Sequence, residues 1–253
     1  RRTEEKCPDR YLPTDVFKEC ANGIIKKCLT VYGYNVNQAI VLDSNSLNTT
    51  RAIHTDYPDA IVHLPNPNED VIQSASKYVG GTVKAEQSYV AEFLLDHPEL
   101  KGKIDLLYLD GEGAALVEGK ENNEEHPDTG LLRFLQGGFA DQRSCMVAHT
   151  FIVRYGQKSI TVDDAINQFC VKFPRWVEDE DYDIKQIADP YIYFRNNYVV
   201  TTFWNIKKKL MKSELLSEVN DVTQSIRQSG KQSKEKVDLF NLCMEQEAGL
   251  LYT

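Results

Sequence analysis

The stretch Ile104-Asp105-Leu106-Leu107-Tyr108-Leu109, followed by Asp110-Gly111-Glu112-Gly113, contains the clearest strand signal in this chain of 253 residues. A short run in which nearly every residue is apolar is typical of a strand buried on both faces of a sheet. The run ends at a loop rich in glycine and acidic residues. This combination predicts a parallel α/β sheet, whose ligands bind at the carboxyl ends of the strands.

The upstream residues repeat the alternation of strand and helix. Two short apolar runs, 39–42 and 60–64, flank a helix-like stretch at 48–56. Two buried strands joined by a crossover helix form the βαβ unit of a parallel sheet. A further strand is expected within 81–88, followed by a helix over 89–95. This helix ends before a proline, because proline disfavours the helical conformation in the residue that precedes it.

The downstream residues add one more parallel strand and an antiparallel pair. A strand is expected at 145–153, between a short helix at 130–139 and an amphipathic helix at 162–173. Two β-rich runs, 191–194 and 198–204, are separated by Arg-Asn-Asn, which favours a tight hairpin turn. The sequence therefore predicts a Rossmann-like, mostly parallel sheet with an antiparallel C-terminal hairpin.

Helical patterns precede and follow the predicted sheet in the sequence. Residues 14–31 show helical spacing of apolar side chains, and the residues from Lys207 onward are helical and polar. We expect an N-terminal helical segment at 1–37, a Rossmann-like domain at 38–206 and C-terminal helices at 207–253. The terminal helices would pack on the domain or bind a protein partner.

Composition restricts the kinds of partner. No segment reaches the roughly 18 to 20 consecutive apolar residues of a membrane span, and the first residues lack the apolar core of a secretory signal. Six cysteines without C-x-x-C spacing are expected to be reduced thiols. We therefore predict a cytoplasmic protein without a membrane partner, with the nucleus as the alternative location.

The charge disfavours nucleic acid as a partner. A formal charge of −9 opposes non-specific binding, because neutralising phosphates requires clustered Lys and Arg. Lys207-Lys208-Lys209 with Lys212 is the candidate basic cluster, and its simpler interpretation is a solvated helix face. Nucleic-acid binding guided by this cluster is a third hypothesis, behind the two given below.

Polar residues follow each predicted strand, where a parallel sheet binds its ligands. None of them lies in a G-x-G-x-x-G, G-x-x-x-x-G-K or H-E-x-x-H motif, so a dinucleotide, triphosphate or zinc-protease site is not indicated. The candidate site residues are, in chain order, Asp43, Ser44, Ser46, Asn66, Asn68, Glu86, Ser88, Asp110 and His149.

The stretch from Ile104 to Glu112 resembles the fourth strand of class I, Rossmann-like methyltransferases that use S-adenosylmethionine. The likeness is greatest to the small-molecule O-methyltransferase type. Met146-Val147-Ala148-His149-Thr150-Phe151, with the helix that begins at Val162, is similar to the fifth strand and following helix of that group. The predicted hairpin would then be the antiparallel pair that closes the methyltransferase sheet.

The resemblance implies positions for the cofactor and for the chemistry. Asp110 and His149 would border the methyl-transfer centre. Asp110 would accept a substrate proton or bind a divalent metal ion, and His149 would act as general base because its pKa lies nearest neutrality. The implied contacts of S-adenosylmethionine are Asp43, Ser44 and Ser46 with its methionine part, Asn66 or Asn68 with the ribose, and Glu86 and Ser88 with the adenine.

Two hypotheses of function follow from this resemblance. The first is an S-adenosylmethionine-dependent methyltransferase acting on an oxygen or nitrogen nucleophile, with a small-molecule or macromolecular acceptor that the sequence does not name. The second is a catalytically inactive methyltransferase-like domain that serves as a binding or scaffold subunit. The second arises because residues 42–48 contain no glycine, whereas the family has a glycine-rich loop there.

Overall fold

The computed structural model describes residues 16–111, 127–141, 143–153, 161–195 and 197–209. Its strands are β1 (Gln38–Leu42), β2 (Ile61–Pro65), β3 (Thr82–Glu86), β4 (Leu106–Asp110), β5 (Cys145–Val153), β6 (Tyr182–Arg195) and β7 (Asn197–Lys208). Its helices are α1 (Val16–Val31), α2 (Asn48–Asp56), α3 (Glu69–Ser76), α4 (Val90–Asp96), α5 (Pro127–Gln136) and α6 (Val162–Asp179). A 3-10 turn lies at Pro98–Leu100.

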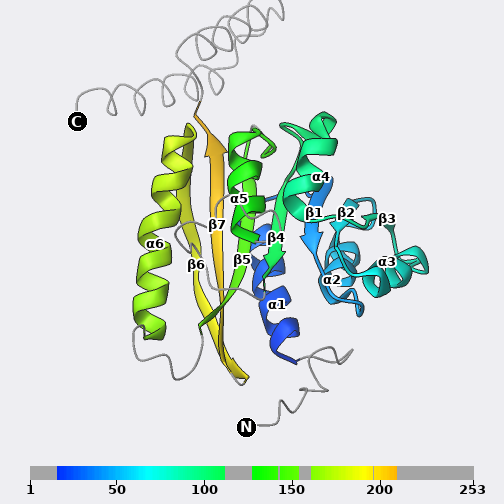
Figure 1. The fold of residues 1–253 in the computed structure, drawn as a ribbon, viewed down its shortest axis with the longest axis horizontal. Coiled ribbons are helices and arrows are strands. Elements are labelled where there is room, and N and C mark those ends of the chain that lie inside the picture. Colours follow the sequence, from blue (N-terminus) through cyan, green and yellow to red (C-terminus); the bar gives the residue numbers. More distant parts are fainter. Residues whose placement is uncertain (1–15, 112–126, 142, 154–160, 196, 210–253) are drawn as a thin grey trace, which may run out of the picture. The chain divides into compact units, whose positions relative to one another are not determined.

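The strands form one sheet in the order β3-β2-β1-β4-β5-β7-β6. Strands β1 to β5 are parallel, whereas β7 is antiparallel to both β5 and β6. Helices cover both faces of the sheet (Figure 1). The predicted α/β sheet with an antiparallel C-terminal hairpin is confirmed. The strand order reverses between β1 and β4, and ligands of open α/β sheets bind at the carboxyl ends of strands at such a point.

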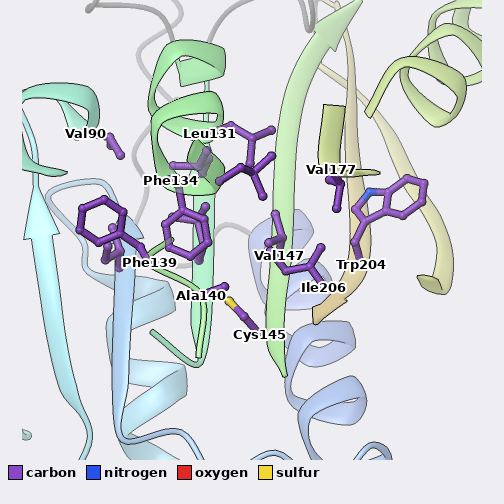
Figure 2. Packing of buried hydrophobic residues seen from close by; sticks show 14 of the residues in the cluster. Val90, Leu131, Phe134, Phe139, Ala140, Cys145, Val147, Val177, Trp204 and Ile206 are labelled. Atoms are coloured by element: carbon purple, nitrogen blue, oxygen red, sulfur yellow. The ribbon is translucent and has the colours of Figure 1, made fainter. Parts of the chain in front are cut away.

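One face of the sheet packs against α4, α5 and α6. Buried side chains from these helices and from alternate strand residues form the larger core, part of which Figure 2 shows. Phe169 and Phe173 of α6 pack on Trp204 of β7, with ring centroids 6.3 and 5.3 Å apart. Leu107 and Leu109 of β4 also point to this face. Burial of this apolar surface is a main stabilising contribution to the fold.

The opposite face packs against α1, α2 and α3. Leu29 of α1 belongs to a core that includes Leu106 and Tyr108 of β4. Because side chains alternate along a strand, Asp110 points to this same face, toward α1. A smaller cluster joins α3 to β2 and consists of Leu47, Leu64, Val71 and Ala75.

Several elements differ from the sequence prediction. Strand β6 begins at Tyr182 instead of 191, and α5 spans Pro127–Gln136 instead of 130–139. The predicted bounds of α2 and β5 agree with the structure, but the helix predicted at 162–173 continues to Asp179 through Pro174. Proline removes one backbone hydrogen bond, and burial of Val177 offsets that loss. Helix α3 has no counterpart in the prediction, because only Val71 and Ala75 among its 8 residues are buried.

The prediction of a helix from Lys207 is wrong at its first three residues. Strand β7 extends to Lys208, and Lys207 lies opposite Asp183 of β6. Opposite charges at paired strand positions stabilise such an extension. Lys207 to Lys209 therefore lie exposed at the end of a strand instead of on a helix face. Lys212 and the predicted C-terminal helices lie outside the described residues.

The described cysteines carry free thiols, and the described helices include no membrane span. Cys20, Cys28, Cys145 and Cys170 are free thiols, while Cys7 and Cys243 lie outside the described ranges. Among the helices that the structure describes, none has the length and apolar character needed to cross a membrane.

Candidate functional site

Two carboxylates lie side by side at the carboxyl ends of β1 and β4. The register of these paired strands places Asp43 and Asp110 at the same level. Both point toward α1, because Val41 and Tyr108, two residues earlier in each strand, belong to the core on that face. Asp43 is 5% exposed, and the side chain of Asp110 is 19% exposed. The structure thus brings together two of the residues predicted from the sequence.

The carboxylate of Asp43 holds the beginning of α2. It accepts hydrogen bonds from the backbone N–H of Ser44 at 2.9 Å and from the backbone N–H and hydroxyl of Thr50 at 2.8 and 3.0 Å. Burial raises the pKa of Asp43, while these hydrogen bonds and the charge of Lys18 oppose the rise. Because all three contacts donate to the carboxylate, they favour its ionised form.

Lys18 of α1 completes this cluster, and sequence reasoning missed it. Its ammonium forms an ion pair with the carboxylate of Asp110, and 16% of its side chain is exposed. Burial alone would lower the pKa of Lys18, but the negative charges of Asp110 and Asp43 hold it above the usual value. A lone lysine in a helix gives no sequence signal for a contact with a residue 92 positions away.

The loop after β1 adopts a left-handed backbone conformation without a glycine. Leu47 has φ 53° and ψ 36°, in the region that favours glycine. Its side chain is nevertheless 1% exposed and packs in the small core beneath α3. Burial of the leucine side chain therefore offsets the backbone strain, and the loop reaches this conformation by packing.

Two polar atoms in the segments that follow β1 and β3 are buried without a hydrogen-bond partner in the part of the chain that the structure describes. They are Nδ2 of Asn48, after β1, and Oγ of Ser88, after β3. The hydroxyls of Ser44 and Ser46, in contrast, bond each other at 2.8 Å. An unpaired buried polar atom costs about 1–3 kcal/mol. Asn48 and Ser88 are therefore suited to pair with a bound ligand.

The two asparagines after β2 shape the loop. Asn66 donates from Nδ2 to the backbone carbonyl of Asp43 at 2.8 Å, and its Oδ1 accepts from the backbone N–H of Asn68 at 2.9 Å. Asn68 accepts from the backbone N–H of Asp70 at 2.9 Å and so caps α3. These contacts leave the amide nitrogen of the exposed Asn68 for a ligand.

Glu86, at the end of β3, pairs with a histidine. Nε2 of His97 lies 2.8 Å from Oε2 of Glu86, and Nδ1 lies 2.8 Å from Oε1 of Glu99. Burial alone would lower the pKa of His97, but the hydrogen bonds to both glutamates raise it above the usual value. The predicted adenine-flanking carboxylate is thus held by a local ion pair.

His149 lies on the opposite face of the sheet from Asp110. In the pairing of β4 with β5, Thr150 is the residue opposite Asp110. The His149 ring is 1% exposed and stacks on Phe169, with centroids 5.1 Å apart. Its Nε2 lies 3.3 Å from Oδ1 of Asp128 but without the geometry of a hydrogen bond. The structure does not bring Asp110 and His149 together.

The described side chains do not form a recognisable metal-binding site. In the described ranges, no group of three or more His, Cys, Asp or Glu residues is arranged to hold one. Asp110, the predicted metal ligand, is paired with the ammonium of Lys18. A carboxylate with a cation already beside it attracts a divalent cation less strongly.

Solved structures share this fold. The chain is similar to Trm1 from Pyrococcus horikoshii in complex with S-adenosyl-L-methionine, with TM-score 0.54 and 12% identity over 79% of this chain. It is also similar to the methyltransferase domain of bacterial CtHen1-C, with TM-score 0.50 and 12% identity over 77% of this chain and 100% of that one. The match spans 56% of the Trm1 chain. No family model and no curated protein matches the sequence. The similarity shows a methyltransferase fold.

Proposed function

We propose that this chain binds S-adenosylmethionine at the carboxyl edge of its sheet and transfers the methyl group to an oxygen or nitrogen nucleophile. The observation that carries the proposal is the pair of carboxylates at the strand-order reversal of a methyltransferase fold, with Asp43 buried and Asp110 partly buried. S-adenosylmethionine carries a sulfonium and an ammonium group, and partly buried carboxylates attract such cations. The Trm1 structure contains this cofactor and supports the same choice of ligand.

The residues of this edge suit the cofactor best at its methionine part. Asp43 would attract the ammonium, and Nδ2 of Asn48 would donate to the carboxylate. Oγ of Ser88 would bond the adenine, and the amide nitrogen of Asn68 would bond a ribose hydroxyl. When bound, the cofactor supplies an electrophilic methyl group, which bonds to the acceptor atom while the electron pair of the broken carbon–sulfur bond stays on sulfur. Asp110 would accept the proton that the acceptor loses.

The acceptor is proposed only as a class. The sequence resemblance favours a small molecule with a hydroxyl or amine group, and the similarity to Trm1 and CtHen1-C assigns no acceptor to this chain. A cytoplasmic location and a protein partner for the terminal helices likewise stay predictions.

Calorimetric titration with S-adenosylmethionine and S-adenosylhomocysteine tests the proposal. We expect saturable binding that Asp43→Asn weakens about tenfold, because the substitution removes the negative charge. The Nδ2 of asparagine cannot replace a carboxylate oxygen that accepts hydrogen bonds at the start of α2, so urea unfolding of the variant has to show that the fold is retained. The matched control is Asp56→Asn, which removes a carboxylate paired with Lys26 at 3.0 Å near the surface. Absence of binding by a protein that unfolds cooperatively would contradict the proposal and favour the binding or scaffold hypothesis. Binding would be followed by an acceptor screen that measures release of S-adenosylhomocysteine.

A further inference from the structure

Lys18 acts electrostatically on both carboxylates at the proposed cofactor edge. Its ammonium is paired with Asp110, and Asp43 lies near enough to contribute to the raised pKa of Lys18. All three side chains are largely buried. Charges in such surroundings interact more strongly than in water. Lys18 therefore determines how much negative charge this part of the site presents to a ligand.

The position of Lys18 is fixed by the helix that carries it. One turn along α1, Asn22 accepts a hydrogen bond from the hydroxyl of Thr49 in α2 at 3.0 Å, and both side chains are buried. Residues four positions apart lie on the same face of a helix, so this bond holds the Lys18 face of α1 against the site. Further along, Ile25 and Leu29 anchor α1 in the core.

We infer that Lys18 is an internal counter-ion that sets the preference of the site between S-adenosylmethionine and S-adenosylhomocysteine. The inference rests on the proposed function. The two ligands share the methionine, ribose and adenine parts, and they differ in a positive sulfonium that becomes a neutral thioether. Two carboxylates without a counter-ion would attract the sulfonium strongly. Lys18 cancels part of that attraction and brings the two affinities closer together.

A smaller preference for S-adenosylmethionine over S-adenosylhomocysteine would favour catalysis. Positive charge leaves the sulfur as the methyl group moves to the acceptor. Attraction that stabilises the bound donor more than the transition state therefore slows the transfer. Lys18 limits this ground-state stabilisation, while Asp43 still attracts the ammonium group that both ligands carry.

A direct contact between Lys18 and the methionine carboxylate is the alternative role, and it makes a different prediction. Both ligands carry this carboxylate. Loss of Lys18 would then weaken both ligands by the same factor. A counter-ion instead changes the ratio of the two dissociation constants, because only one ligand carries the sulfonium.

The experiment measures the dissociation constants of both ligands by calorimetry for the wild type, Lys18→Met, Asp110→Asn and the double variant. We expect Lys18→Met to raise the preference for S-adenosylmethionine about tenfold and Asp110→Asn to lower it about tenfold. The double variant removes one charge of each sign, so its ratio should return to within about twofold of the wild type. Lys26→Met, on the same helix and paired with the one-third-exposed Asp56, should leave the ratio unchanged.

The outcomes separate this inference from the function on which it rests. A wild-type protein that binds neither ligand contradicts the proposed function. A wild type that binds both, with a ratio that neither single variant changes, overturns the counter-ion role. Equal loss of both affinities in Lys18→Met and in the double variant also overturns it and assigns Lys18 to the carboxylate. If Lys18→Met fails to fold, Asp110→Asn and the neutral double variant still decide between these roles.

Discussion

Asp110 and His149 project from opposite faces of the same sheet, although they lie near the same edge on neighbouring strands. Asp110 meets Lys18 of α1, whereas His149 stacks on Phe169 of α6. The cause is the register of β4 and β5, which places Thr150 beside Asp110 and turns His149 to the other side. We therefore propose Asp110, which points to the α1 face, as the general base at the proposed cofactor edge.

Replacing His149 with Phe tests whether its ring nitrogens serve the site. Neither nitrogen makes a hydrogen bond in the described part of the chain, and Phe preserves most of the ring volume and the stacking on Phe169. We expect the affinity for S-adenosylmethionine to stay within about twofold. The substitution also removes the ring nitrogen that lies 3.3 Å from the buried carboxylate of Asp128, so the free energy of unfolding should fall by about 1–3 kcal/mol. Calorimetry and urea unfolding measure the two quantities. A tenfold loss of affinity by a variant that still unfolds cooperatively would place His149 in the site.

The substitution Leu47→Gly tests which of two opposing effects on the free energy of unfolding is larger, relief of backbone strain or loss of side-chain burial. Glycine would relieve about 1–2 kcal/mol of strain at the left-handed conformation. Loss of a fully buried leucine side chain costs about 3–5 kcal/mol, so burial is the larger effect. We expect a net destabilisation of roughly 1–4 kcal/mol in urea unfolding. A variant more stable than the wild type would show that strain, and not packing, governs the loop.

Two glycines in helices should respond to alanine in opposite directions. A Cβ at Gly130 of α5 would lie 2.9 Å from Cβ and Cγ1 of Val90 in α4. Gly130→Ala should therefore destabilise the fold by about 1–3 kcal/mol. Gly23 of α1 has no atom within 4 Å of the added Cβ, and Gly23→Ala should stabilise by about 0.5–1 kcal/mol. Thermal unfolding distinguishes the two, and equal shifts would contradict the close contact of α4 with α5.

Two histidines should make opposite contributions to the pH dependence of stability. Burial, together with the nearby charges of Lys84 and His97, lowers the pKa of His63 from 6.5 to about 4. The unfolded chain then binds a proton more readily, so this contribution to stability is lost as pH falls from 6.5 toward 4. The raised pKa of His97 acts in the opposite sense. Its contribution is present below its unfolded pKa and is lost as pH rises through its folded pKa.

Urea unfolding at pH 7 and pH 5 checks both signs. Between these values, His63→Gln should lose about 2 kcal/mol less stability than the wild type. His97→Gln should lose more stability on acidification than the wild type, because the favourable protonation is gone. Identical pH dependence of all three proteins would show that neither histidine is perturbed in the fold.

Local signals in the sequence determined most of the elements and two members of the candidate site. The apolar run that ends at Asp110 marks β4, and the stretch 48–56 marks α2, because hydrophobic periodicity is a property of neighbouring residues. Asp43 and Asp110 followed from the rule that ligands bind after parallel strands. Helix α3 was not visible, because two buried residues make too weak a periodic pattern.

Tertiary structure alone decided which of these side chains meet. The ion pair of Lys18 with Asp110 joins residues 92 positions apart, and the left-handed conformation of Leu47 depends on a core beneath α3. The face to which His149 points depends on strand register, and a shift of one residue reverses it. Sequence pattern reports what each segment does by itself, whereas contacts between distant segments depend on how the whole chain packs.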